Sequence, residues 1–506
     1  MKIDFSFVTG IWLRWFLVSL TLHVVTTGTA HASANLGPAH DPVEGIWLGT
    51  IKSPQGTTAE IGLEFLRADR GTLVFSLHFP EMATYAVPFM IPVETDGKGH
   101  YAITPNFNII LDLAGDHLTG TFGRAKLPLE LTRGGKFPAK PTPTLYPAAP
   151  RPLWKFKLGA GTWAPPVVAD HIIYIGTSAG LFHAVQATDG TGIWTWHGTA
   201  GIDGRAVVGS ELVYVVDTKM TLLALDRIHG TVRWSAALHD EQIAGQPAPE
   251  NPTFNHRAAT PLLLDGVIYC GSSDGGLYAF NADTGSKLWR HDAKAPIYSG
   301  VSIQGADTLL FGTMDGSVVL LDRRSRKETS RIKTDGGVVT TPLVASGRLI
   351  VGSRDYQLYG FNLADGTVAW KYSYWFSWIE STPVVADGVL YVGASDYARV
   401  TALDPATGQT RWSTQVRGMN WGTPLVTAHR VFTGTVAQNI PGTVIAHTGG
   451  IMAINRRTGE VIWQLAAALP QENGFGGYAG SLAIAGDKII AAGFDGMLIA
   501  LPVDSL

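Results

Sequence analysis

The chain has 506 residues, with 38 Lys and Arg against 41 Asp and Glu, a formal net charge of -3. This balance excludes a nucleic-acid partner, because proteins that bind phosphate backbones carry a strong basic surplus. Glycine is abundant at 59 residues and only 16 % of residues are charged, so the composition predicts short apolar strands joined by many tight turns.

The first 34 residues have the pattern of a secretory signal peptide. Lys2 and Arg14 precede an apolar stretch, and Ala32-Ser33-Ala34 supplies small residues for cleavage. The stretch has about eleven residues, fewer than the ~20 that cross a bilayer, so we expect cleavage; an uncleaved amphipathic anchor is the alternative. No Cys stands at the cleavage site, so we expect no lipid anchor. The pattern predicts a periplasmic or secreted protein.

Residues 43–133 alternate apolar and polar side chains between closely spaced turn signals, as in Ala59–Phe65. This alternation predicts a small antiparallel β-barrel or sandwich of six to eight strands. Its opening, Gly45-Ile46-Trp47-Leu48-Gly49, resembles the start of lipocalin-type barrels. Such a barrel holds either a ligand cavity or a core of packed side chains.

Residues 134–152 contain six prolines. Proline at this density favours extended polyproline II, so we expect a semi-rigid linker between two domains.

From residue 153 onward the sequence repeats itself, with the form A-x-D-x-x-T-G-x-x-x-W over Ala402–Trp412. Further copies end at Trp194, Trp234, Trp289, Trp370 and Trp463, and a degenerate copy has Ser330 in place of Trp. Consecutive copies lie 40 to 55 residues apart, which is the length of one four-stranded propeller blade. We expect each Trp to pack between successive blades.

The last repeat ends before its own Trp strand, and Leu153–Phe156, directly after the linker, has no blade of its own. We therefore expect this segment to complete the last blade and close the ring. The predicted fold is all-β, an eight-bladed β-propeller over residues 153–506 preceded by the small β domain. Cys270, the one Cys of the chain, lies in an apolar strand, so we expect a buried hydrophobic residue rather than a reactive thiol.

The A-x-D-x-x-T-G-x-x-x-W repeat resembles the propeller of pyrroloquinoline-quinone (PQQ) dehydrogenases and of BamB-type outer-membrane assembly proteins. The resemblance implies the fold but not the function, because the motif residues are structural.

Binding residues are expected on one face of the ring. The connections between blades and the turns between second and third strands share this face, and both long insertions, near Leu238–His256 and Val436–Thr448, belong to it. Aligned inner strands place carboxylates, an amide, an arginine and aromatic rings there. These residues are Asp203, Glu380, Asn420, Arg257, Trp163, Trp421 and Tyr298. Such groups suit Ca²⁺ with a flat acidic cofactor, and equally a sugar or a peptide.

The resemblance to quinoprotein dehydrogenases implies roles for these residues. Asp203 or Glu380 would be the catalytic base, and Glu380 with Asn420 would bind Ca²⁺. The implied PQQ contacts are Arg257, Asn420, Trp421, Trp163 and Tyr298. The chain departs from many of those enzymes because it lacks the adjacent Cys pair and a C-x-x-C-H haem segment.

An unusual run of aromatic residues, Tyr372–Trp378, precedes Glu380. An exposed aromatic cluster marks a binding surface, which predicts that Trp375 and Trp378 bind a partner. The alternative is that alternate residues of the run pack beneath the loop.

Two functions follow from these patterns. The first is an exported propeller that binds an envelope protein, a peptide or a small-molecule ligand through its loop-rich face. The second is a soluble dehydrogenase that oxidises an alcohol or a sugar with PQQ and Ca²⁺.

Overall fold

The computed structural model describes residues 40–52, 56, 58–68, 71–82, 84–89, 91–104, 107–123, 126–139, 145–239, 259–375, 377–438, 449–468 and 474–503. The chain divides into two compact units, Met1–Thr142 and Pro143–Leu506. The predicted signal peptide lies outside the described residues. Within the described part of the chain, no helix has the length and apolar character needed to cross a membrane.

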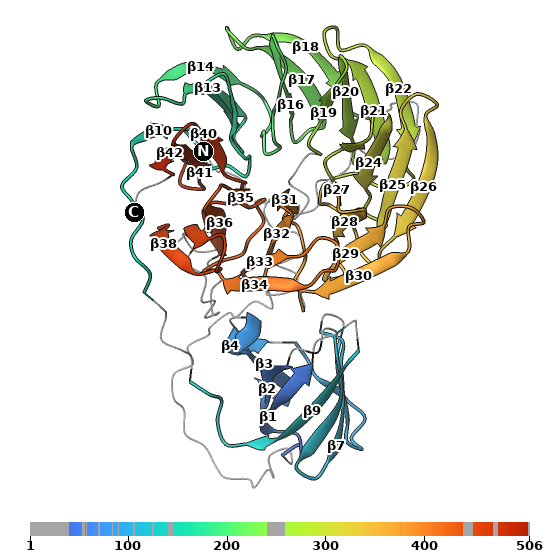
Figure 1. Cartoon of the computed structure of the whole chain (residues 1–506). Helices are drawn as coiled ribbons and strands as arrows, with labels where there is room; N and C mark the ends of the chain where they lie inside the picture. The colour runs from blue at the N-terminus through green and yellow to red at the C-terminus, as the bar shows by residue number, and fades with distance from the viewer. Residues whose placement is uncertain are drawn as a thin grey trace, which may run out of the picture. The chain divides into compact units, whose positions relative to one another are not determined.

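The first unit contains one antiparallel sheet in the order β4-β3-β2-β1-β9-β8-β7-β6-β5 (Figure 1). Its elements are β1 (Gly45–Lys52), β2 (Thr58–Arg67), β3 (Leu73–Phe79), η2 (Pro80–Met82), β4 (Thr84–Phe89), β5 (Glu94–Thr95), β6 (His100–Ile103), β7 (Ile109–Ala114), β8 (His117–Phe122) and β9 (Leu127–Gly134). The nine described strands exceed the six to eight expected, because the two-residue strand β5 carries no alternation that a sequence pattern can detect.

The strands that come first and last along the chain in this unit, β1 and β9, pair with each other in the middle of the sheet. Trp47 on β1 is buried, and its indole N–H donates to the carbonyl of Val43 at 2.6 Å. The guanidinium of Arg133 on β9 lies 4.2 Å from the centre of the Trp47 ring. Arg133 also donates to the carbonyls of Pro42 and Glu44, so these contacts attach the chain preceding β1 to the end of β9.

The described part of the second unit forms eight further sheets, which we call blades, arranged in a ring (Figure 1). Blade 1 contains β11 (Val167–Ala169), β12 (Ile172–Gly176), β13 (Leu181–Gln186) and β14 (Gly192–His197). Blade 2 contains β15 (Val207–Val208), β16 (Leu212–Val216), β17 (Thr221–Asp226) and β18 (Val232–Ala237). Blade 3 contains β19 (Leu262–Leu264), β20 (Val267–Gly271), β21 (Gly276–Asn281) and β22 (Lys287–Asp292). Blade 4 contains β23 (Ser302–Gln304), β24 (Thr308–Gly312), β25 (Ser317–Asp322) and β26 (Lys327–Lys333).

The remaining blades repeat this arrangement. Blade 5 contains β27 (Leu343–Ala345), β28 (Arg348–Gly352), β29 (Gln357–Asn362) and β30 (Val368–Ser373). Blade 6 contains β31 (Val384–Ala386), β32 (Val389–Ala394), β33 (Arg399–Leu403) and β34 (Thr410–Gln415). Blade 7 contains β35 (Leu425–Val426), β36 (Arg430–Gln438), β37 (Gly450–Asn455) and β38 (Val461–Ala466), with β39 (Phe475–Gly477) paired to β36. Blade 8 contains β40 (Ala483–Ala485), β41 (Lys488–Ala492), β42 (Met497–Pro502) and β10 (Trp154–Lys157).

The pairing of β10 with β42 closes the ring, with Trp154 opposite Ala500 and Phe156 opposite Leu498. The predicted eight-bladed propeller, completed by its own first strand, is confirmed. Closure pairs the backbone N–H and C=O groups that β42 would otherwise expose at a sheet edge.

The second half of the proline-rich segment lies with the propeller. Ala148 forms a parallel bridge with Gln464 of β38, and Gln464 donates its backbone N–H to the carbonyl of Pro147 at 2.9 Å. Proline lacks an N–H but keeps its carbonyl, so a proline-rich chain can still accept hydrogen bonds from an edge strand.

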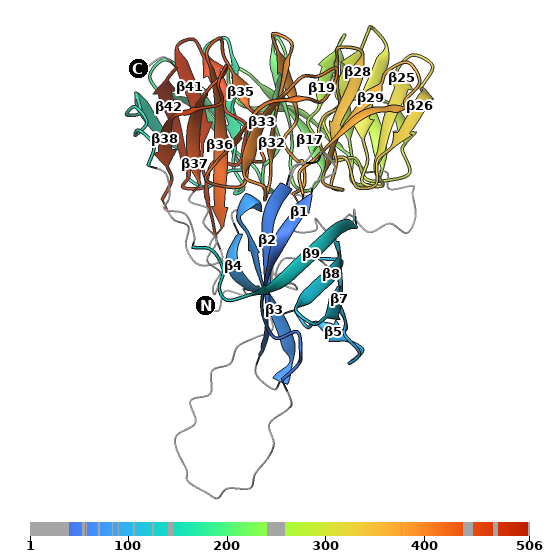
Figure 2. The same cartoon turned by 60° about the horizontal axis from the view of Figure 1, so that its bottom comes forward.

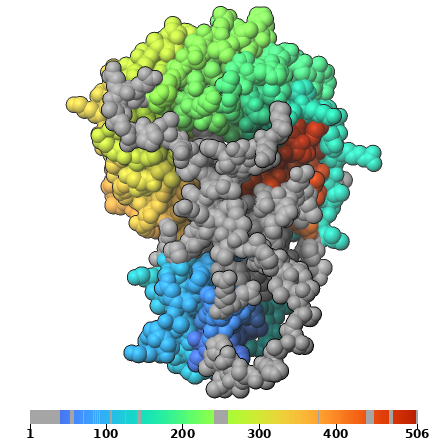
Figure 3. Space-filling view, turned by 180° about the vertical axis from the view of Figure 1, so that it is seen from behind, coloured from blue at the N-terminus to red at the C-terminus, as the bar shows by residue number. Residues whose placement is uncertain are grey.

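Each blade has two ends, and the blades seen from the side run between two opposite faces (Figure 2). The turn face carries the turns between first and second strands and between third and fourth strands. The loop face carries the turns between second and third strands and the connections between blades. Neighbouring blades, coloured from green to yellow, form a continuous surface in Figure 3.

On the turn face, the repeated Trp side chains join successive blades. In five joints the indole N–H donates to a carbonyl of the next blade: Trp154 to Ala187, Trp194 to Arg227, Trp234 to Ala282, Trp370 to Pro405 and Trp412 to Arg456, at 2.9 to 3.2 Å. A Cβ on Gly285, which has a φ of +71°, would lie 2.5 Å from the Trp234 ring, so the Thr-Gly turn needs glycine for conformation and for space. Blade 4 lacks this Trp, and its Ile332 contacts the corresponding Gly366 instead.

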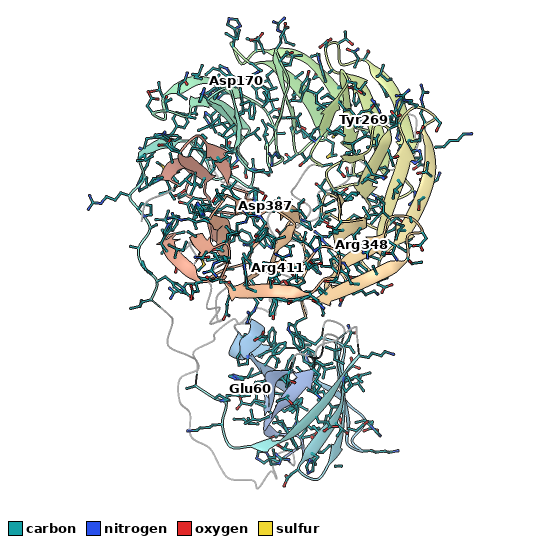
Figure 4. All side chains as sticks on the ribbon, viewed as in Figure 1. Glu60, Asp170, Tyr269, Arg348, Asp387 and Arg411 are labelled. Carbon is teal, nitrogen blue, oxygen red and sulfur yellow. The ribbon has the colours of Figure 1, made fainter. Side chains whose placement is uncertain are left out.

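A second type of joint on the turn face combines Arg, Asp and Tyr. Arg456 of blade 7 donates to the Tyr391 hydroxyl at 3.0 Å and pairs with Asp387 at 2.8 Å, both on blade 6. Arg227 makes the same contacts with Tyr174 and Asp170 between blades 2 and 1. Arg323 pairs with Asp265 between blades 4 and 3, where Tyr269 raises the pKa of Arg323 through a side-chain hydrogen bond. Figure 4 labels Asp170, Tyr269 and Asp387.

Candidate functional site on the loop face

Glu380 lies four residues before the inner strand of blade 6, β31, and is half-buried on the loop face. Arg354, in the turn between β28 and β29 of blade 5, donates to Glu380 Oε1 from Nε at 3.0 Å and from Nη2 at 2.7 Å. The Arg354 guanidinium also lies 4.6 Å from the centre of the Trp378 ring. The Glu380 carboxylate is therefore held in an ion pair that an indole covers.

Asp396 lies beside this pair, in the turn between β32 and β33 of blade 6. Burial and the negative charge of Glu380 raise the pKa of Asp396 to about 6, while a hydrogen bond from Ser395 opposes the shift. The site therefore contains a carboxyl group whose protonation state changes near pH 6. Alignment of the inner strands could not identify Arg354 or Asp396, because both lie in turns. Alignment of the turns between second and third strands would have placed both residues on the loop face.

Trp163 and Trp421, which the sequence places in one layer, contact each other. Their rings stack with centroids 5.3 Å apart, and Phe475 and Phe494 pack against Trp163 at 5.2 and 4.7 Å. We call these four residues the aromatic cluster. The Trp421 indole N–H donates to Ser395 Oγ at 2.5 Å, which connects the cluster to the Asp396 turn.

Tyr298 and Asp203 occupy the same register in other blades. Burial raises the pKa of Tyr298, and the nearby positive charge of Arg354 opposes the shift, so Tyr298 belongs to the surroundings of Arg354. Asp203 is 7 % exposed and accepts a hydrogen bond from Ser178 Oγ at 2.7 Å. Asp203 belongs to blade 2 and Glu380 to blade 6, on opposite sides of the ring, and each is bonded to a turn residue of the preceding blade.

Asn420 is completely buried between blades 6 and 7. Its Nδ2 donates to Thr433 Oγ1 and to the carbonyl of Gly434 on β36. Its Oδ1 lies so close to Gly393 of β32 that a Cβ there would overlap it. Within the described part of the chain this buried oxygen has no hydrogen-bond partner, and the backbone of β32 borders it on one side.

The carboxylates and the amide that the resemblance assigns to Ca²⁺ therefore do not form a common ligand set in the described arrangement. Glu380 is paired with Arg354, Asn420 is enclosed by two blades, and Asp203 lies across the ring. Within the described ranges, no three His, Cys, Asp or Glu side chains form a group that could hold a metal ion. Arg257 lies outside the described residues. The predicted ligand set does not form because Glu380 and Asp203 bond to turn residues of the preceding blade.

The aromatic run before Glu380 packs mostly inward. Tyr374 is completely buried and contacts Tyr397 of blade 6 at 6.0 Å, and Trp375 is only 5 % exposed. The expected exposed surface at Trp375 is therefore absent, because the run fills the space between blades 5 and 6. Trp378 is half-buried and covers Arg354, so it is the member of the predicted pair that keeps some exposed surface.

Comparison with known proteins identifies the propeller. The family described as "Outer membrane protein assembly factor BamB" matches residues 145–254, 196–302, 273–376 and 374–505. Outer membrane protein assembly factor BamB of Yersinia pestis is 25 % identical over 237 residues, covering 42 % of this chain and 54 % of that protein. Quinoprotein alcohol dehydrogenase PedH of Pseudomonas putida is 32 % identical over 108 residues, covering 19 % of this chain and 18 % of that protein.

The chain thus spans about half, or less, of the length of these curated relatives. The crystal structure of BamB from Moraxella catarrhalis superposes with a TM-score of 0.54 and 16 % identity, covering 70 % of this chain and 99 % of that one. Identity at this level shows a shared fold. The family match, by contrast, covers most of the sequence and every blade. The chain therefore belongs to the family of outer membrane protein assembly factor BamB.

Proposed function

We propose that this protein is a binding module of the cell envelope, located in the periplasm, that holds a partner on the loop face of its propeller. The observation that carries the proposal is a continuous strip of side chains across blades 5, 6, 7, 8 and 1. We call it the loop-face strip: Arg354, Trp378, Glu380, Asp396, Ser395, Trp421, Trp163, Phe475 and Phe494.

The composition of this strip suits protein recognition. Trp and Arg are the residue types most often found at the energetic centre of protein interfaces, where they supply a large area and fixed donors. The Arg354–Glu380 pair beneath Trp378 supplies a charged centre, and the aromatic cluster supplies an apolar neighbour. Because the chain belongs to a family of outer-membrane protein assembly factors, the proposed partner is a protein of outer-membrane protein assembly.

Site-specific crosslinking in cells tests this proposal. A photoreactive amino acid at Trp378 on the loop face should crosslink to an envelope protein, identified by mass spectrometry. The same amino acid at Arg457, which is exposed on the turn face, is the matched control. Crosslinks from Arg457 and none from Trp378 would assign binding to the other face and contradict the proposal.

The dehydrogenase function remains the second candidate, because the relatives include quinoprotein alcohol dehydrogenase PedH. Purified protein titrated with PQQ and millimolar Ca²⁺ distinguishes the two. The enclosed amide of Asn420 and the paired carboxylate of Glu380 lead us to expect no bound-quinone absorbance and no reduction of an artificial acceptor by alcohols or sugars. Stoichiometric quinone binding that Glu380→Gln abolishes would instead support the dehydrogenase.

A further inference from the structure

A second set of residues, most of them polar, surrounds the axis of the propeller. In each blade it lies two residues further along the chain than the register of Glu380, and it is separate from the loop-face strip. It consists of the residue that stands two places before each inner strand. We call these residues the inner ring: Pro165, Arg205, Thr260, Gly300, Thr341, Thr382, Thr423 and Ser481. Five of the eight carry a hydroxyl group, one is an arginine, and none is acidic.

Contacts between blades show that the members lie side by side. The backbone N–H of Thr341 donates to Thr382 Oγ1 at 3.2 Å, and that of Thr423 donates to Ser481 Oγ at 2.8 Å. A Cβ on Gly300 would overlap Thr341 Oγ1, so these two members touch as well. The hydroxyl groups of Thr341, Thr382 and Ser481 therefore lie toward the preceding blade.

The hydroxyl groups of the inner ring have donor capacity to spare. Thr382 and Ser481 each accept a backbone N–H, and a hydroxyl can donate one hydrogen bond besides. Among the described residues, no hydroxyl of the inner ring donates to a protein acceptor. All five of these residues are half-buried, so water or a ligand reaches them.

Arg205 stands where the repeat elsewhere prefers a hydroxyl residue. The corresponding residue of the preceding blade is Pro165, which has no N–H, so a hydroxyl at position 205 would have no such donor to accept from. Within the part of the chain that the structure describes, the Arg205 guanidinium makes no hydrogen bond and no ion pair. The nearest acidic residue along the chain, Asp203, is engaged by Ser178.

The exposure of Arg205 shows where its side chain lies. Arg205 is exposed although it lies two residues before the inner strand β15, which β16, β17 and β18 cover from outside and β11 and β19 flank. With these sides covered, the open directions for its side chain are the axis of the ring and the loop face. Burial lowers the pKa of Arg205, as expected for a cation that water reaches but protein surrounds. An arginine remains charged at neutral pH under such conditions.

We propose that the inner ring binds a carboxylate group at the axis of the propeller, held by the Arg205 guanidinium and by neighbouring hydroxyl groups. A guanidinium presents two parallel N–H groups to the two oxygens of a carboxylate, and hydroxyl donors satisfy the remaining lone pairs. One arginine matches the single negative charge of a carboxylate, whereas a phosphate monoester carries nearly two. This site is separate from the loop-face strip and does not depend on its function.

Ligand-dependent thermal unfolding of the mature protein tests the proposal. The probe is N-acetylglycine, a carboxylate without other charge, at constant ionic strength, with its uncharged amide and inorganic phosphate as comparison ligands. We expect a saturable rise of the unfolding midpoint with N-acetylglycine alone, because a ligand that binds only the folded state stabilises it. Arg205→Gln should weaken the apparent affinity at least tenfold, and Arg457→Gln on the turn face should leave it unchanged.

Three outcomes would overturn the proposal: no saturable response of the natural protein, the same response in Arg205→Gln, or tighter binding of phosphate than of the carboxylate. Circular dichroism establishes whether Arg205→Gln is folded. If it is not, Arg205→Lys keeps the charge and loses the two parallel donors, so its affinity should fall several-fold. Unchanged affinity in Arg205→Lys would contradict recognition by the guanidinium.

Discussion

The two faces of the propeller are built from the same repeat, yet they use their polar groups in opposite ways. On the turn face, Arg456 and Trp412 find their partners within the adjoining blade. On the loop face, the residues at equivalent positions differ from blade to blade, as Asp203, Glu380 and Trp421 show. A repeated contact stabilises the ring, whereas an unrepeated residue is free to serve one site. Variation within a repeat therefore indicates where binding is located.

The largest expected difference between the faces is found on a single strand. Trp194 lies near the turn-face end of β14 and donates to the carbonyl of Arg227. Trp196 lies near the loop-face end and, among the described residues, donates no hydrogen bond across a blade joint. Trp194→Ala removes ring packing and a hydrogen bond, so it should lower the free energy of unfolding by about 3 kcal/mol. Trp196→Ala should lower it by about 1 kcal/mol. Urea denaturation measures both, and equal losses would contradict the assignment of stability to the turn face.

The Arg–Asp–Tyr joint offers a smaller test with an adjacent control. Arg456 contacts Tyr391 and Asp387 of the preceding blade, whereas Arg457 is exposed and uses only its backbone. Arg456→Ala leaves buried acceptors unsatisfied and should destabilise the protein by about 2 kcal/mol. Arg457→Ala should change stability by less than about 0.5 kcal/mol. Similar effects of both substitutions would show that the joint is a surface ion pair without structural importance.

The contribution of Asp396, on the loop face, to the free energy of unfolding should fall as pH rises. The pKa of Asp396 is about 6 in the folded protein, above its ordinary value, so the folded state holds this proton over a range in which the unfolded state has lost it. The stability contributed by this proton is fully present at or below about pH 4 and is lost as pH rises through about 6, by up to about 3 kcal/mol. Asp396→Asn, which resembles the protonated form, should remove this part of the pH dependence. Parallel pH profiles for the two proteins would contradict it.

The smallest effect concerns a residue that belongs to neither face. Cys270 is completely buried on β20, and burial raises the pKa of its thiol to about 12. We expect no reaction with a thiol reagent in the native protein and complete reaction in urea, measured by the absorbance of the released chromophore. Rapid labelling under native conditions would show that blade 3 opens locally.

Much of the fold was predictable because blades repeat local rules. The Thr-Gly turns, the Trp strands and the vacancy filled by Trp154 on β10 are all properties of sequence spacing. The short strand β5 and the bridge between Ala148 and Gln464 were not predictable, because neither has a pattern of its own. Each depends on a neighbouring strand that is distant in sequence.

The candidate site was predictable only in part. The meeting of Trp163 and Trp421 followed from their shared register, and the structure brings them together. The partner of Glu380 was missed because Arg354 lies in a turn of another blade. The supposed calcium ligand Asn420 proved to pack between blades, which alignment of inner strands cannot reveal.

The sequence by itself determined the architecture of the ring, its number of blades and its closure, because turn conformation and strand spacing are local properties that each repeat states again. The tertiary structure alone decided which side chains act together. Whether a carboxylate meets a cation, an amide or nothing depends on the turn of the preceding blade, which lies tens of residues away. Thus Glu380 forms an ion pair with Arg354, Asn420 lies enclosed between blades 6 and 7, and Arg205 has an exposed side chain at the inner ring.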